Sequence, residues 1–196
     1  ALLDEAGYGQ RGADGIRLDP SGARFAPALG TTAGNALRLQ VSQIFRENMA
    51  ACGIDVALTY LPPSAFFAAG PEGALFGRRT DLGLFAWLTG VQPPCDLYMG
   101  SRVPGPVGEV FEATGAPYTG WGGDNLNQTG WANAAYDAAC QTALGTLPGT
   151  PEYAAAHMEA QRLFAQELPV LPLFLGLKVS ATQPDVLNFS LDPTQN

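Results

Sequence analysis

Residues 35–61, NALRLQVSQIFRENMAACGIDVALTYL, hold the two patterns that decide the fold. Over residues 35–51 apolar side chains recur every three or four positions, which predicts an amphipathic helix that Thr32 or Asn35 can cap and that Gly53 ends. Residues 54–61 alternate apolar and polar side chains, which predicts a half-buried strand. The apolar face of the helix is expected to consist of Leu37, Val41, Ile44, Phe45, Met49 and Cys52.

The neighbouring segments extend this pattern into an α/β fold. Residues 23–32 read as an extended segment, and Pro27 favours an edge or irregular position for it. Strand, helix and strand in this order predict a right-handed crossover. Residues 82–88, LGLFAWL, form a nearly continuous apolar run. Such a run is typical of a central strand that is buried on both faces.

The second half of the chain is less regular at its start. Residues 89–132 are rich in Gly, Pro, Asn and aromatic side chains, and a long irregular stretch of this kind is usually functional. Asn133 and Thr150 are suitable N-caps for two helices, the second with Pro151 in its first turn. The apolar, Pro-containing residues 168–179 are expected to add one or two short strands to the core.

Composition excludes several classes of function. The chain has 196 residues, a formal net charge of −8 and a pI near 4.4, with 10 basic residues, and we therefore expect no nucleic-acid partner. The sequence contains no run of 18 apolar residues, so no membrane span is predicted. Residues 1–7 read as the end of a helix that a glycine stops, so we expect the chain to be part of a longer protein.

Three cysteines are present, at positions 52, 95 and 140. Their spacing and the one histidine do not suit a zinc site, so no metal or other cofactor is expected. In an oxidising compartment one disulfide and one buried free thiol would result. We favour a bridge from Cys95, in a Pro-rich loop, to Cys140, on a helix. Cys52 is expected to belong to the core.

Catalysis is not expected. His157 is the one candidate for an imidazole base, and it lies within a predicted helix on an apolar stripe. No G-x-S-x-G motif supplies a nucleophile. Residues 7–12 spell G-x-G-x-x-G, but a strand does not precede them and a helix does not follow, so they do not predict a dinucleotide site. A hydrolase or transferase that uses His157 is the alternative hypothesis.

Aromatic and amide side chains give a better indication of function. Phe85 and Trp87 end the apolar run, and Asn125 and Asn127 lie in the irregular stretch. Rings exclude water, while amides offer donors and acceptors, and a small-solute cleft requires both. We expect these four residues to contact a solute, and for Trp87 a role as a core anchor is an equal alternative. Trp131, also in this stretch, is expected to pack in the core.

Seven segments in order, LLDEAGY, ADGIR, TTAGNALRLQVSQIF, GIDVALTYLPPSAFFA, DLGLFAW, NQTGWANAAYDAAC and AQELPVLPLF, resemble the C-terminal half of family 5 extracellular solute-binding proteins. These are the oligopeptide-, dipeptide- and nickel-binding receptors of ABC importers. The resemblance covers about residues 1–190. It implies a periplasmic-binding-protein-like lobe (type II, cluster C), with a mixed sheet flanked by helices. All of residues 1–196 would form one C-terminal lobe of a two-lobed protein.

The resemblance also implies a function and a location. The partners would be a peptide or similar small solute, the permease subunits of an ABC importer and a missing N-terminal lobe. The protein would be extracytoplasmic, either periplasmic or lipid-anchored at the outer face of the cell membrane. Peptide-binding relatives hold the ligand's ammonium with a carboxylate three residues after the tryptophan, where this chain has Gly90. That departure opens the alternatives of a sugar oligomer or a metal chelate. A solute-sensing receptor lobe is a further alternative.

Overall fold

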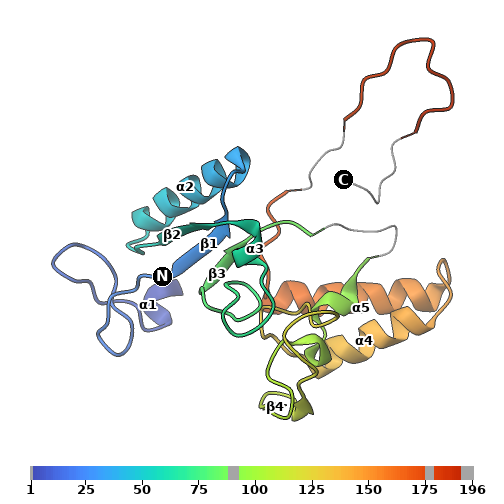
Figure 1. Ribbon diagram of the computed structural model, residues 1–196. Helices are drawn as coiled ribbons and strands as arrows, with labels where there is room; N and C mark the ends of the chain where they lie inside the picture. Colours follow the sequence, from blue (N-terminus) through green and yellow to red (C-terminus); the bar gives the residue numbers. More distant parts are fainter. Residues whose placement is uncertain (1, 88–92, 175–178, 191–196) are drawn as a thin grey trace. The chain divides into compact units, whose positions relative to one another are not determined.

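The computed structural model describes residues 2–87, 93–174 and 179–190 (Figure 1). They form two compact units, whose boundary in the sequence lies between Ala86 and Trp87. Each unit is described by itself below. Among the described residues, no helix has the length and apolar character that crossing a membrane requires.

The first unit is built on a parallel sheet with strand order β2-β1-β3 (Figure 1). Its elements are α1 (Leu2–Glu5), β1 (Ala28–Thr32), α2 (Ala36–Ala51), β2 (Ala57–Leu61), α3 (Pro63–Phe66) and β3 (Leu82–Leu84). The predicted strand–helix–strand unit is therefore confirmed as β1–α2–β2. Leu29, Ile54 and Val56 form the buried core of this unit, and Phe45 and Met49 of α2 pack against it.

Strand β1 lies in the centre of this sheet, and the expectation that Pro27 would place it at an edge was wrong. In the hydrogen-bond ladder of a sheet a proline lacks the N–H donor but keeps the carbonyl acceptor, and here Pro27 directly precedes the strand. The carbonyl oxygen of Pro27 still accepts a 3.0 Å hydrogen bond from the amide of Ala57. The amide of Ala28 donates to the carboxylate of Asp81 at 2.7 Å. The proline therefore removes no bond from the ladder.

Strand β3 is shorter and less buried than its sequence predicts. It comprises three residues at one edge of the described sheet, and the side chain of Leu82 is 39% exposed. The expectation of a central strand buried on both faces was therefore wrong for the residues that the structure describes. An apolar run reports the hydrophobicity of a segment and carries no information about how many strands flank it.

Helix α2 begins and ends as predicted, and the predicted apolar stripe is confirmed in part, because Phe45 and Met49 pack against the core. The side chain of Asn35 accepts a 2.9 Å hydrogen bond from the amide of Arg38, and Gly53 follows the helix with a φ of +83°. Ser42 is fully buried, whereas Leu37 and Ile44 are exposed. Cys52, expected in the core, is also exposed. The inward face therefore contains Phe45 and Met49 of the predicted stripe together with Ser42, which the stripe did not include.

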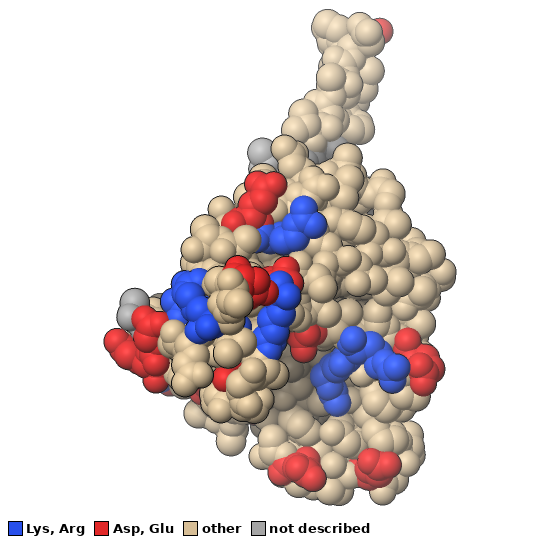
Figure 2. All heavy atoms as spheres, turned by 90° about the vertical axis from the view of Figure 1, so that its left-hand side faces the viewer, with Lys and Arg blue, Asp and Glu red and all other residues tan. Residues whose placement is uncertain are grey.

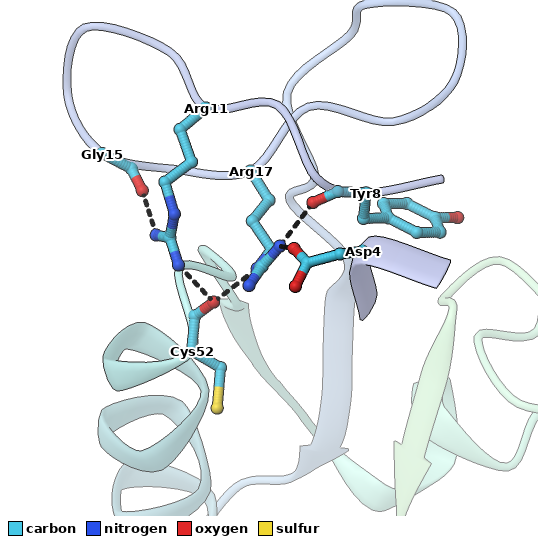
Figure 3. A network of polar contacts seen from close by, with 6 residues as sticks. All are labelled: Asp4, Tyr8, Arg11, Gly15, Arg17 and Cys52. Atoms are coloured by element: carbon cyan, nitrogen blue, oxygen red, sulfur yellow. Dashed lines mark hydrogen bonds and ion pairs between the residues drawn. The ribbon is translucent and has the colours of Figure 1, made fainter. Parts of the chain in front are cut away.

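Two arginines hold the N-terminal loop against the end of α2 (Figure 3). Arg17 Nε and Arg11 Nη2 both donate to the carbonyl oxygen of Cys52, at 2.8 Å and 3.3 Å. Arg17 also pairs with Asp4 at 2.6 Å and donates to the carbonyl oxygen of Tyr8 at 2.6 Å. Positive charge is favourable at a helix C-terminus, where the backbone carbonyls lack partners. The loop is therefore fixed through the cap of the helix.

The second unit is mainly irregular before two long helices. Its elements are η1 (Cys95–Tyr98), η2 (Gly100–Arg102), β4 (Val110–Phe111), β5 (Ala116–Pro117), α4 (Ala134–Gly145) and α5 (Pro151–Glu167). Helices α4 and α5 pack against each other. Asn133 and Thr150 cap them as predicted, through bonds from the amides of Tyr136 and Tyr153.

A disulfide joins Cys95 of η1 to Cys140 of α4, and this is the pairing that we favoured from the sequence. Both cysteines belong to the core of this unit, together with Met99, Tyr136 and Ala160. The bridge fixes η1 to α4.

The described residues 168–174 and 179–190 contain no strand, and residues 175–178, which belong to the segment expected to form short strands, lie outside the described residues. Their large apolar side chains are exposed, including Phe174 at 60% and Leu187 at 81%.

Positively and negatively charged residues are intermixed on the surface. On the face that Figure 2 shows, basic and acidic side chains lie next to one another, in keeping with the ion pairs of Arg24 with Asp14 and Asp55.

Candidate functional site

The carboxyl ends of β1, β2 and β3 lie at the same end of the parallel sheet in the first unit, which we call its carboxyl edge. In parallel α/β sheets ligands bind at this edge, where successive connections leave a strand in opposite directions. Strand β1 is such a point, because β2 and β3 lie on either side of it. Thr31 Oγ1 donates a 2.6 Å hydrogen bond to the carbonyl oxygen of Leu84 and ties the ends of β1 and β3 together.

Arg38 brings a positive charge to this edge. Its Nη1 donates a 2.6 Å hydrogen bond to Oγ1 of Thr32, the last residue of β1. The arginine lies in the first turn of α2, where the helix dipole is also positive. The edge therefore favours an anionic group. Arg38 is not among the site residues expected from the sequence, although an arginine in the first turn of the predicted helix is a signal that could have found it.

Phe85 follows β3 at the same edge. Its ring lies 6.3 Å from that of Phe66, which is fully buried, and 6.0 Å edge-to-face from that of Phe67. Phe85 itself is half-buried. One side of its ring therefore packs on the core of the first unit.

Trp87 opens the second unit and is half-buried. Burial raises the pKa of the Tyr98 hydroxyl, and a side-chain interaction with Trp87 opposes that rise. Gly90, where relatives have a carboxylate, lies outside the described residues.

The two asparagines expected to contact a solute are buried within the second unit. Asn127 is fully buried, and its Nδ2 donates to the carbonyl oxygens of Tyr98, Met99 and Trp131 at 3.0, 3.0 and 2.8 Å. Its Oδ1 accepts from Thr129 Oγ1 at 2.6 Å. These contacts use both polar atoms of the amide. Asn127 therefore holds the irregular stretch together, and we do not include it in the proposed binding site.

Asn125 has a similar environment. It is 5% exposed, its Oδ1 accepts from Thr119 Oγ1 at 2.7 Å, and its Nδ2 donates to the carbonyl oxygen of Gly122 at 3.0 Å. The amides that the sequence suggested for a ligand thus bind the chain's own backbone and hydroxyls. Trp131 packs against Tyr136 and Phe164, with ring centroids 4.8 Å and 5.7 Å apart, as a core position requires.

His157 lines an apolar groove and is 7% exposed. Its ring lies 4.4 Å edge-to-face from the ring of Tyr153. The groove has a volume of about 250 Å³ and lies in the second unit. Among the described residues, no three His, Cys, Asp or Glu side chains gather in a way that could hold a metal ion. The histidine therefore has the surroundings of a packed residue.

Comparisons with solved structures identify the fold. An oligopeptide-binding protein from Thermus thermophilus, solved with a pentapeptide, is 28% identical with a TM-score of 0.70. A nickel–histidine-bound protein from Campylobacter jejuni is 16% identical, with a TM-score of 0.64. A mannohexaose-bound periplasmic oligopeptide-binding protein of an ABC transporter from Thermotoga maritima is 22% identical, with a TM-score of 0.60.

These alignments cover 88%, 86% and 87% of this chain but only 28%, 29% and 29% of the other chains. No family model and no curated protein sequence matches the chain. The structural neighbours are nevertheless those that the seven sequence segments predicted. This chain therefore has the α/β, periplasmic-binding-protein-like fold of family 5 oligopeptide- and nickel-binding proteins, over a length that corresponds to less than a third of such a protein.

Proposed function

We propose that this chain is the C-terminal lobe of an extracytoplasmic receptor that binds peptides or similar small solutes and delivers them to the permease of an ABC importer. The observation that carries this proposal is the similarity to the pentapeptide-bound protein over 88% of this chain. That similarity extends over 28% of the other protein, which leaves room for a complete second lobe. The missing N-terminal lobe would close on the solute by a hinge motion.

The location follows from two observations. One neighbour is periplasmic by name, and Cys95 and Cys140 are joined by a disulfide. Disulfides persist in oxidising compartments, such as the periplasm and the cell surface. We therefore propose that the protein works outside the cytoplasm, either free in the periplasm or anchored at the outer face of the membrane.

In the first unit, binding would use the carboxyl edge of the sheet. Arg38 would pair there with an anionic group of the solute, which in a peptide is the C-terminal carboxylate, and Phe85 would contribute apolar surface that excludes water. Trp87, in the second unit, stays a candidate solute contact in its own right. With glycine at position 90, another group would hold a peptide's ammonium. Sugar oligomers and metal chelates, which two of the neighbours bind, are the competing solutes.

A non-catalytic role agrees with the surroundings of His157. A general base needs hydrogen-bond reach to the proton that it removes. His157 is instead buried against Tyr153. If the protein is a hydrolase that uses His157, His157→Ala should abolish turnover of a panel of peptides and esters. If it is a receptor, neither the wild-type protein nor the variant should turn over these compounds.

The proposal is tested by a thermal-shift screen of the full-length protein against oligopeptides, oligosaccharides and metal chelates. A solute that binds only the native state raises the melting temperature. We expect peptides to raise it and Arg38→Gln to reduce that shift. The matched control is Arg46→Gln, since Arg46 is exposed on the same helix. Shifts with sugars or chelates alone would reject peptides as the solute, and no shift with any class would reject solute capture.

A further inference from the structure

The β4–β5 hairpin, which we define as residues 106–118, has an exposed apolar side (β4 is labelled in Figure 1). Val110 pairs with Pro117 across the two strands, and both residues are exposed. The next pair, Phe111 with Ala116, is half-buried. Successive residues of a strand point to opposite faces, so the first pair lies on the outer face of the hairpin and the second on the inner face.

The inner side of the hairpin is packed and hydrogen-bonded. The ring of Phe111 lies 5.9 Å from that of Tyr118, and the Tyr118 ring lies so close to Gly105 that a Cβ there would collide with it. The amide of Gly115 closes the turn with a 2.8 Å hydrogen bond to the carbonyl oxygen of Phe111. The amide of Tyr118 donates to the carbonyl oxygen of Glu109 at 2.9 Å. The hairpin is therefore preformed, and a partner would bind it without having to order it.

Two glutamates flank the exposed Val110. Glu109 and Glu112 directly precede and follow the two residues of β4, and both are exposed. The described arginines of this unit, Arg102 and Arg162, pair with other acids. Neither glutamate therefore has an ion pair with a described residue, and the hairpin presents uncompensated negative charge beside apolar side chains.

The second unit as a whole is acidic. Residues 87–196 contain three of the chain's ten basic residues and ten of its eighteen acidic residues, whereas residues 1–86 contain seven basic and eight acidic residues. A field of one sign attracts a partner of the opposite sign and raises the rate of encounter. The surface around the hairpin thus fits a basic partner, and self-association through the hairpin would bring like charges together.

We propose that the β4–β5 hairpin is a docking surface for a protein that presents basic side chains around a small apolar contact, and that this protein is the permease of the importer. The inference rests on the proposed function, which requires the receptor to dock before it delivers a solute. Protein interfaces combine an apolar centre with a polar rim. Val107 and Val110, at 77% and 55% exposed, would form the centre, and Glu109 and Glu112 the rim.

The test is uptake of a labelled oligopeptide by cells of the source organism whose receptor gene is replaced by wild type or a variant of the full-length protein. The oligopeptide is one that raises the melting temperature of the wild-type protein. We expect Glu109→Lys/Glu112→Lys to lower the initial uptake rate about tenfold, because it sets like charges against the basic partner. Val107→Ser/Val110→Ser should lower the rate about threefold, through lost apolar contact.

The matched control is Glu5→Lys/Glu47→Lys, which changes the net charge by the same amount at two exposed positions of the first unit. It should leave the uptake rate unchanged, because the proposal assigns docking to the hairpin and not to the net charge of the protein. Thermal unfolding and calorimetric titration with the same oligopeptide complete the comparison. Each hairpin variant should keep the melting temperature and the peptide affinity of the wild type.

The outcomes separate this inference from the proposed function. If the wild type supports no uptake of a peptide that it binds, delivery to a permease and the docking proposal are both overturned. If the hairpin charge variant supports the same uptake as the control variant, the docking proposal fails while the receptor stands. A lower melting temperature or weaker peptide binding of both hairpin variants would show that the hairpin packs within the receptor itself, which also overturns the proposal.

Discussion

Tyr136 donates a 2.6 Å hydrogen bond to the carbonyl oxygen of Cys95, while Cys140, one helical turn further along α4, is bridged to the same residue by its sulfur. One helix thus holds Cys95 through both its backbone and its side chain. Pro93 and Pro94 directly precede this anchored residue. The described segment that begins at Pro93 is therefore held to α4 at Cys95.

Loss of the disulfide should lower stability markedly. The bridge closes a separation of 45 residues, and the chain-entropy relation assigns about 4 kcal/mol to a loop of that length. We expect Cys95→Ala/Cys140→Ala to lower the free energy of unfolding by about this amount. Thiol titration provides the control, because the exposed Cys52 should react as a single thiol in the native protein. Three reactive thiols in the denatured, unreduced chain would contradict the bridge.

Asn127→Ala should destabilise the second unit. The substitution leaves three backbone carbonyl oxygens without their shared donor, which should cost about 3 kcal/mol in the free energy of unfolding. Denaturant unfolding measures the loss. Asn48→Ala on the exposed surface of α2 is the matched control and should change stability by less than about 0.5 kcal/mol. A stable Asn127→Ala protein with weakened solute binding would instead support a direct ligand contact.

Two glycines with the same backbone conformation should respond differently to alanine. Gly34 and Gly53 both have a φ of +83°, so each substitution incurs the cost of a left-handed backbone, about 1 kcal/mol. A Cβ at Gly34 would meet open space, whereas one at Gly53 would meet the guanidinium of Arg11. Gly53→Ala should therefore lower the melting temperature more than Gly34→Ala does. Equal effects would show that Arg11 moves aside freely.

The pH dependence of stability should change with Asp137→Asn. Burial raises the pKa of Asp137 above its ordinary value of 3.8, and the hydrogen bond from the Gly100 amide opposes the rise. An acid with a raised native pKa contributes stability below its unfolded pKa and loses it as pH rises through the native value. Asparagine retains an acceptor for Gly100. We expect the melting temperature of the variant, relative to wild type, to increase from acidic to neutral pH; a constant difference would oppose this assignment.

Local signals predicted the helices well. Asn35, Asn133 and Thr150 each accept a hydrogen bond from the amide three residues later, and a cap of this kind depends only on adjacent sequence. The central place of β1 was not predictable in the same way, since it depends on which segments pair with each strand. The burial of Ser42 in place of Ile44 has the same origin, because the sheet decides which face of α2 turns inward.

The candidate site was only partly predictable from sequence. Phe85 and Trp87 were suggested because they end an apolar run, and both stay candidates. Asn127 looked like a ligand residue, and three carbonyl oxygens distant in sequence converge on it instead. Arg38 was missed because its significance depends on its contact with Thr32 at the sheet edge. In each case the deciding fact is a tertiary contact.

The exposed residues beyond α5 have a practical consequence for handling the protein. Proteases act on backbone outside helices and sheets, and many prefer to cut beside large apolar side chains, which the described residues 168–174 and 179–190 provide. Limited digestion of this chain should therefore remove the C-terminal segment first and leave a resistant fragment that ends near Glu167. If the proposed N-terminal lobe covers these side chains, the same bonds should be slow to cleave in the full-length protein, so the digestion rate would provide a direct assay of lobe association.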